Sequence, residues 1–460
     1  MRSDCQIGSS WLRSLLLLAL PVIINPVPGQ VPGQAAGQEA GPSGGSVRLG
    51  IEEAVRYGID QNKGLAADRL QIAAAAGRLR QAGLKANPML ESSGLTGLND
   101  PGMQSVAVGL TLPLEVGRRS RRVSLAGHEL ERSRHEVADR ERMLAADIRL
   151  RFAEILAVRE ELALGRRMVE LNQEMLRLVS ARVTEGVSAR LEENMQLVEL
   201  RRSEAKVAAL ESRLNALTEE FKGQIGLPID ATLLMEGQLP SSPHGDGANG
   251  AAHEVVERAL RSRPDLRAAQ VAEEIGEAMI EMARAEGRFD LSIFGEIGWQ
   301  RWRFDQLGRM DDRFVPVGMR TGMIRGGVNI MLPTRNRNQG GIEAAVAWRD
   351  EARLRSEFVR SIIRREVQTA LEKIDGAQKV LRTFDNNLIE SQEKNHQIIR
   401  ASFELGHARL TDLLAEQRRL VELRMELTAA RRELLTANIE LARAIHQIPG
   451  QPPGQTPARR

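Results

Sequence analysis

The longest regular pattern in the chain is a seven-residue repeat of apolar side chains. Near the C-terminus leucine recurs at this spacing without a break, at Leu413, Leu420, Leu427, Leu434 and Leu441. A period of 3.5 residues predicts long α-helices that pack as coiled coils. Three further seams share the spacing: Val367, Ile374, Leu381 and Leu388; Ile148, Ile155, Leu162 and Val169; and Leu200, Val207, Leu214 and Phe221. We predict one continuous helix over 338–404, roughly 100 Å long at 1.5 Å per residue.

Shorter segments between these helices alternate apolar with small or polar side chains. Val106, Val108, Leu110 and Leu112 are separated by single small or polar residues, and similar alternation occurs at 290–300 and 324–332. A period of two predicts strands with one apolar face. The pattern suits membrane strands and a half-buried soluble sheet equally. Only four such strands can be counted, and four cannot close a barrel around a lumen, so a barrel would need several chains.

The same order of elements occurs twice in the sequence. The segment around Ala82 recurs 201 residues later around Ala283, and Leu112-Pro113 recurs as Leu332-Pro333. Each copy reads as one helix (roughly 51–86 and 254–287), two strands and two long helices, with extra residues in the second strand pair at about 301–322. The predicted organisation is a first repeat at 48–228, a linker at 229–253, a second repeat at 254–449 and a disordered tail at 450–460.

The N-terminal segment has the pattern of a secretory signal peptide. Arg2 and Arg13 precede an apolar run at 15–24 that is too short to span a bilayer. We assign 1–36 to a signal peptide and flexible start; the alternative is a buried N-terminal helix. Cys5 is the only cysteine, which excludes a disulfide within the chain and a Cys₄ zinc site. Because Cys5 precedes the apolar run, it is misplaced for lipid attachment.

Composition and motifs favour a non-enzymatic helical protein. Aromatic residues make up only 3% of the chain, and the formal net charge of +3 gives no whole-chain signal for nucleic acid binding. Hydrolase and P-loop motifs do not occur, so no enzyme activity and no cofactor are predicted. His128 and His135 share a helix face, but the sequence shows no third ligand beside them, so no metal site is predicted.

These features together resemble the TolC-type outer-membrane efflux proteins over about 48–449. The segments LPLEVGRRSRR (112–122) and LPTRNRNQGG (332–341) are similar to those of the heavy-metal branch, which serves cobalt-zinc-cadmium or copper efflux. The resemblance implies a mainly α fold with a small β part. Three chains would form a 12-stranded β-barrel continued by a 12-helix periplasmic α-barrel, in the outer membrane and the periplasm. Trp299 and Trp302 are the expected interfacial anchors of the strands.

The resemblance also implies a function and partners. The protein would be the passive outer-membrane exit duct of a tripartite efflux system, conducting heavy-metal cations. It would form a homotrimer, contact outer-membrane lipid, and work with a periplasmic adaptor (membrane fusion) protein and an inner-membrane RND-type pump, without nucleic acid. The alternatives are a duct for drugs or type I secreted polypeptides, and a periplasmic coiled-coil scaffold or adaptor.

Two glycine-containing turns between the long helices are the candidate functional sites. By resemblance they form the periplasmic tip, where the adaptor docks, and their residues are Gly186, Arg190, Leu191, Gly406, Arg409 and Leu410. Asp412 matches an acidic position that lines the aperture, with Glu192 or Glu193 as its first-copy counterpart. Arg409 is three residues before Asp412 and is expected to form an ion pair with it.

A cluster of arginines follows the first strand pair. Arg118, Arg119, Arg121 and Arg122 are read either as a solvated helix start or as an electrostatic anchor at the periplasmic rim of the barrel.

Overall fold

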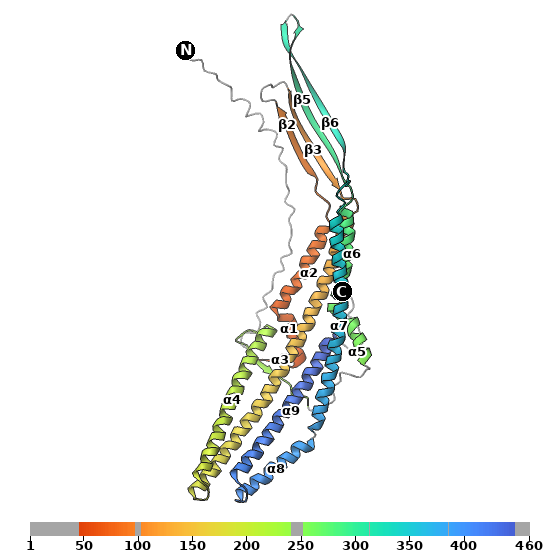
Figure 1. The fold of residues 1–460 in the computed structure, drawn as a ribbon. Coiled ribbons are helices and arrows are strands. Elements are labelled where there is room, and N and C mark those ends of the chain that lie inside the picture. The colour runs from red at the N-terminus through yellow and green to blue at the C-terminus, as the bar shows by residue number, and fades with distance from the viewer. Residues whose placement is uncertain (1–45, 97–102, 241–251, 312, 385, 447–460) are drawn as a thin grey trace, which may run out of the picture. The chain divides into compact units, whose positions relative to one another are not determined.

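The computed structural model describes residues 46–96, 103–240, 252–311, 313–384 and 386–446 (Figure 1). The expected signal peptide at 1–36 and the expected tail at 450–460 lie outside these residues. Among the described helices, none combines the length and the apolar composition that a membrane crossing requires.

The two halves of the chain contain corresponding elements. The first half contains β1 (Ser46–Leu49), α1 (Ile51–Gln61), α2 (Lys63–Ala82), β2 (Met89–Thr96), β3 (Met103–Leu114), α3 (Arg118–Thr184) and α4 (Arg190–Ile225). The second half contains β4 (Thr232–Met235), α5 (Ala252–Ser262), α6 (Pro264–Glu286), β5 (Asp290–Met310), β6 (Arg313–Met331), α7 (Gln339–Thr383), α8 (Asn386–Glu404) and α9 (Leu410–Ala444). The fold is therefore mainly α with a small β part, as predicted.

The first predicted helix of each copy is two helices, so this prediction was wrong. In the first half, the Asn62 side chain accepts a hydrogen bond from the Leu65 N–H and donates one to the Gln224 carbonyl, at 2.9 and 2.8 Å. In the second half Pro264 begins α6, a position that needs no N–H donor. Asparagine at an N-cap and proline at a first helical position are both readable in sequence, and they mark the two breaks.

The predicted continuous helix over 338–404 is also interrupted. Val367, Ile374 and Leu381 are buried along α7, but Phe384 leaves the helical conformation with ψ of 45°. Beyond this break Leu388 is 43% exposed. The buried seven-residue seam of α7 therefore does not continue unbroken into α8, because the helix is interrupted at Phe384.

Part of the predicted linker at 229–253 is ordered as a strand. Residues of β4 pair in parallel with β1, from Ser46 opposite Thr232 to Leu49 opposite Met235. A four-residue strand is too short to carry a readable period of two, which is why the sequence did not reveal it. Residues 241–251 lie outside the described part of the chain.

The long helices pack side by side through two apolar cores. α3 lies between α2 and α6, α6 packs against α7, and α4 and α9 return along α3 and α7 (Figure 1). In the first core Phe152 of α3 meets Phe221 of α4 edge to face, with ring centroids 6.0 Å apart. The second core contains Val367 of α7 and Leu434 of α9. The predicted coiled-coil packing between the hairpin helices is confirmed at these positions.

The sheet has the strand order β2-β3-β5-β6, with every neighbouring pair antiparallel. Register places Val108 opposite Ile297, and Ile297 opposite Ile324, so the predicted apolar positions share one face. The opposite face is more polar, although it also carries Phe294, and it contains an ion pair between Glu296 and Arg325 at 3.5 Å.

The second strand pair is longer than the first. β3 pairs with β5 only as far as Met103 opposite Trp302, and the β5–β6 hairpin continues beyond this point. The extra residues expected at about 301–322 extend this hairpin. Trp299 lies on the apolar face, but the continuous register puts Trp302 on the polar one. The two expected anchors therefore lie on opposite faces of the sheet, and only Trp299 is on the apolar one.

A buried guanidinium holds the start of α6, and its removal is our first prediction. Arg263 is 3% exposed and hydrogen-bonds both Asp265 and Glu366. Burial raises the pKa of Asp265, but the hydrogen bonds and charge of Arg263 outweigh this and bring it below its ordinary value. We expect Arg263→Met to lower the free energy of unfolding by about 2–3 kcal/mol at pH 7, less than for a fully buried pair because both carboxylates keep some solvent.

This effect should depend on pH. Because the pKa of Asp265 is depressed in the folded state, its stabilisation is present above the unfolded pKa of about 4 and is lost as the pH falls through the folded value. Thermal unfolding curves at pH 7 and below pH 4 should therefore show a smaller difference between wild type and Arg263→Met in acid. The exposed Arg267→Met is the control, with an expected change within about 0.5 kcal/mol.

Candidate functional site at the two helix–helix turns

The turns after α3 and α8 have the same backbone conformation. Gly186 and Gly406 adopt φ of 78° and 79°, the left-handed region that glycine tolerates best. Val187 N–H donates to the Arg182 carbonyl and His407 N–H to the Ser402 carbonyl, each at 2.8 Å. These six-to-one bonds define Schellman motifs, which satisfy carbonyls at a helix end. The helix-stopping geometry expected for both glycines is confirmed.

Arg182, a residue that sequence reasoning missed, connects the two turns. Its Nη1 donates a hydrogen bond of 2.8 Å to the Phe403 carbonyl, and its guanidinium carbon lies 4.9 Å from the centroid of the Phe403 ring. Nothing in the sequence distinguishes this arginine from the many others on α3. The contact joins the end of the first hairpin to the end of the second.

The two turns differ in burial although their sequences correspond. Leu410 is 1% exposed and belongs to an apolar cluster with Met175 and Val179 of α3. Its counterpart Leu191 is 68% exposed. Arg190 and Arg409 are both exposed. Within one chain, the first hairpin covers Leu410 of the second turn, whereas Leu191 of the first turn is exposed.

The candidate acidic residues lie in the first turns of α4 and α9. Asp412 is exposed, and its Oδ2 accepts a hydrogen bond of 3.3 Å from the Arg409 backbone N–H. The predicted ion pair with the Arg409 guanidinium was therefore wrong, because the carboxylate caps the helix instead. Glu193 accepts a hydrogen bond of 2.7 Å from Ser180, and Glu192 is half-buried. Negative charge at these helix N-termini is favoured by the helix dipole.

Buried polar side chains connect the hairpin helices above the turns. Gln196 Nε2 donates to Asn172 Oδ1 at 3.2 Å. At the corresponding place in the second half, Gln392 Nε2 donates to Glu416 Oε1 at 2.6 Å. Gln417 also donates to Asn172 Oδ1 at 3.2 Å, which links the two hairpins. Buried hydrogen bonds of this kind specify helix register, because a shifted register would leave the groups unsatisfied.

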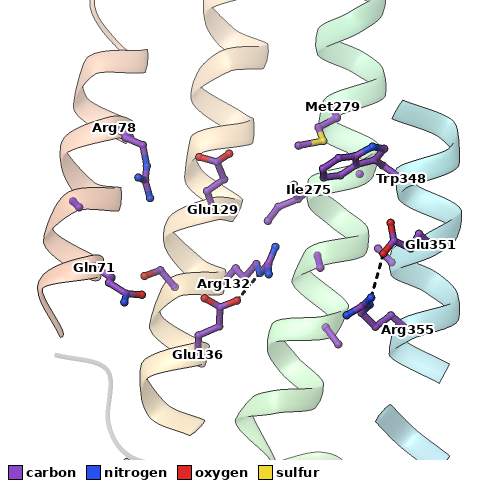
Figure 2. A pocket seen from close by; sticks show the side chains of 16 residues that line it. Gln71, Arg78, Glu129, Arg132, Glu136, Ile275, Met279, Trp348, Glu351 and Arg355 are labelled. Atoms are coloured by element: carbon purple, nitrogen blue, oxygen red, sulfur yellow. Dashed lines mark hydrogen bonds and ion pairs between the residues drawn. The ribbon is translucent and has the colours of Figure 1, made fainter. Parts of the chain in front are cut away.

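A second candidate site is an open cavity of about 860 Å³ lined by α2, α3, α6 and α7 (Figure 2). Arg132 pairs with Glu136 at 2.8 Å and Arg355 with Glu351 at 3.3 Å. Charges of both signs and the exposed Trp348 line it, unlike the largely apolar walls of typical small-molecule pockets.

Three arginines of the cluster at the start of α3 hydrogen-bond carbonyls at the ends of neighbouring helices. Arg119 Nε donates to the Gly83 carbonyl at 2.6 Å and Arg122 Nε to the Ala82 carbonyl at 3.1 Å. Arg118 Nε donates to the Ala285 carbonyl at 3.1 Å. The reading as a solvated helix start holds in part, because Arg119 and Arg121 are exposed. The guanidinium bonds nevertheless satisfy the last carbonyls of α2 and α6 and hold both helices to α3.

Comparisons with known proteins agree with this architecture. Residues 58–219 and 255–446 match the sequence model of the family described as outer membrane efflux protein. The chain is 21% identical over 378 residues to the cobalt-zinc-cadmium resistance protein CzcC of Cupriavidus metallidurans, covering 82% of this chain and 85% of that protein. It is 23% identical over 377 residues to the pyoverdine export outer membrane protein OpmQ of Pseudomonas aeruginosa, covering 79% and 75%.

Among solved structures, the Campylobacter jejuni CmeC outer membrane channel superposes with a TM-score of 0.69 at 14% identity, covering 86% of this chain and 85% of that one. The duplicated strand pairs and long helical hairpins thus have the fold of solved outer-membrane channels. The chain belongs to the outer membrane efflux protein family, the TolC-type family that the sequence resembled. It is accordingly an outer-membrane protein.

Proposed function

We propose that this protein is the exit duct of a tripartite efflux system, passively conducting substrates across the outer membrane. The observation that carries the proposal is the sheet's uncovered apolar face, joined directly to helices that end in exposed turns. α3 begins four residues after β3 and runs for 67 residues to the first turn. At 1.5 Å per residue it spans roughly 100 Å, enough to extend from the outer membrane far into the periplasm.

A lumen requires several copies of the chain. Four strands are too few to close a barrel, whereas three chains supply twelve strands and a matching ring of helices. Native mass measurement in detergent tests this, with a homotrimer expected. A stable monomer that retains its full helical content would overturn the duct.

The turns are the proposed contact with a periplasmic adaptor, which would connect the duct to an RND-type pump. The exposed Leu191 and Val187 of the first turn offer apolar anchors, and Arg190 and Arg409 offer charge beside them. Gly186, Gly406 and the buried Leu410 would maintain the turn geometry. Leu191→Ser should then weaken adaptor binding in a pull-down, while Ile229→Ser, at an exposed residue outside the turns, should not.

Heavy-metal cations are the proposed cargo, supported by the similarity to CzcC. The similarity to OpmQ, a pyoverdine export protein, favours an organic cargo as the second candidate. Deleting the gene should lower tolerance of cobalt, zinc or cadmium ions more than tolerance of dyes and detergents. The reverse ranking would favour the organic cargo, and the protein would then be assigned to drug export instead of metal export.

A further prediction concerns Asp412, with Glu192 and Glu193 as its first-half counterparts at the proposed aperture. A ring of three carboxylates in a trimer would attract cations and hinder anions. We expect Asp412→Asn to lower cation selectivity in planar-bilayer recordings while thermal stability stays near wild type, because the amide oxygen still accepts from Arg409 N–H. Asp412→Ala would also remove this cap, at about 0.5–1 kcal/mol. Unchanged selectivity in both variants would remove Asp412 from the aperture.

A further inference from the structure

The contact between α3 and α6 contains ion pairs at a seven-residue spacing along α3. Arg121 pairs with Glu281 at 3.3 Å, and one heptad further His128 Nδ1 lies 3.1 Å from Glu274 Oε2. The second position thus holds an imidazole where the first holds a guanidinium. Unlike a guanidinium, a neutral imidazole has a lone pair that can bind a metal ion.

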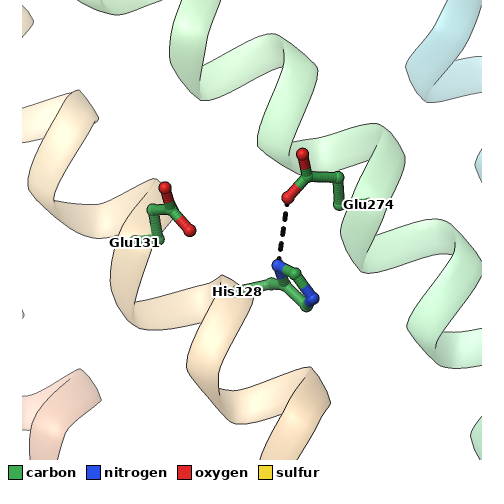
Figure 3. Close-up of side chains that lie close together, drawn as sticks. All are labelled: His128, Glu131 and Glu274. Atoms are coloured by element: carbon green, nitrogen blue, oxygen red, sulfur yellow. Dashed lines mark ion pairs between the residues drawn. The ribbon is translucent and has the colours of Figure 1, made fainter.

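A second carboxylate lies beside this pair. Glu131 is on α3, one helical turn after His128, and Figure 3 shows its side chain beside the other two between the helices. One ligand atom from each of His128, Glu131 and Glu274 lies within 4.8 Å of the others. Among the described residues, the only ion-pair partners of the two carboxylates are His128 and, at 4.0 Å from Glu131, His135. Two carboxylates so placed repel each other unless a cation is shared between them.

The distances suit a tetrahedral metal ion. Zinc binds imidazole nitrogen and carboxylate oxygen at about 2.0–2.2 Å, so neighbouring ligand atoms in a tetrahedral site are about 3.3 Å apart. The 3.1 Å between His128 Nδ1 and Glu274 Oε2 is close to this spacing. Glu131 would supply the third ligand atom, within 4.8 Å of the other two, so the set has one nitrogen and two carboxylate ligands and leaves the fourth position for water.

We propose that His128, Glu131 and Glu274 form a binding site for a divalent ion with the ligand preference of Zn²⁺. The site is distinct from the turns and from the proposed aperture, and it requires no assumption about the cargo. Because α3 belongs to the first half of the chain and α6 to the second, a bound ion would join the two halves. Binding to the folded state alone would raise its stability with ion concentration.

The experiment uses the full chain in detergent, freed of metal. Zn²⁺ is titrated in competition with a chelating indicator, and thermal unfolding is followed with and without Zn²⁺. The wild type should bind zinc with a rise in Tm. His128→Gln and Glu274→Gln should each weaken this zinc binding at least roughly a hundredfold, because loss of a direct ligand exceeds the 10–100-fold effect of an outer-shell partner. The exposed Glu277→Gln, one turn along α6, and His407→Gln, at the second turn, are the matched controls.

The two ligand variants make the outcomes decisive. If both lose the zinc-dependent rise in Tm while their metal-free Tm stays near wild type, the bridging site is established. If only His128→Gln loses it, the ion does not bridge the helices. If wild type gains no stability from zinc, or if Glu277→Gln behaves as Glu274→Gln does, the proposal is wrong. None of these results depends on efflux, so the duct is tested separately.

Discussion

Replacing Ile324 with arginine is expected to prevent stable insertion of the protein in the outer membrane. Ile324 is 88% exposed near the middle of β6, on the face that it shares with Ile297 and Val108. If this face contacts lipid, an arginine near the bilayer centre costs about 2–4 kcal/mol in each chain. The quantity to measure is the amount of protein in the outer-membrane fraction, which we expect to fall severalfold or more.

The same strand supplies the control. Thr321 is exposed on the opposite face of β6, opposite Gln300 and on the side of the Glu296–Arg325 ion pair. Thr321→Arg should leave the amount in the outer membrane close to wild type, because this face is already polar. Equal losses in Ile324→Arg and Thr321→Arg would contradict a lipid-facing apolar surface, and normal insertion of both would do so as well.

A methyl group added at Gly276 is expected to destabilise the protein. Gly276 lies where α6 crosses α7, and a Cβ there would be 2.7 Å from the Arg349 Cα and 2.8 Å from its Cβ. These atoms belong to a neighbouring helix backbone and its first side-chain carbon, so they cannot move aside cheaply. We expect Gly276→Ala to lower the free energy of unfolding by about 1–3 kcal/mol, measured as a decrease in Tm.

An otherwise similar helical glycine should respond in the opposite direction. Gly376 lies within α7, and a Cβ there would meet nothing within 4 Å. Gly376→Ala should therefore raise stability by up to about 1 kcal/mol, through the better helix propensity of alanine. A Tm shift of the same sign in both variants would contradict the close approach of α6 and α7.

Local periodicity accounts for what sequence reasoning predicted well. The leucine spacing through Leu434 and Leu441 predicted a helix with one buried stripe, and both residues are buried. The alternation around Val108 predicted a strand with one apolar face, and register confirms that face across three strands. Both patterns repeat within a few residues, so they report backbone geometry without knowledge of distant partners.

Helix ends and partners needed information that periodicity does not contain. Asn62 interrupts a helical pattern because its side chain reaches the Gln224 carbonyl at the end of α4. The parallel pairing of β1 with β4 joins segments that are almost two hundred residues apart. The two turns show the same limit of sequence reasoning. The Arg182 side chain bonds the Phe403 carbonyl and connects the hairpins, whereas Arg409 bonds Asp412 only through its backbone N–H.

The sequence by itself determined the long helical and strand segments, the duplicated order of elements and the positive-φ glycines of the two turns, because these follow from spacing and backbone chemistry within short segments. Only the tertiary structure decided which groups meet. Leu191 and Leu410 occupy corresponding places after similar turns, yet one is exposed and the other is covered by Met175 and Val179 of α3. Burial depends on the neighbouring helix, and no local pattern encodes which neighbour is present.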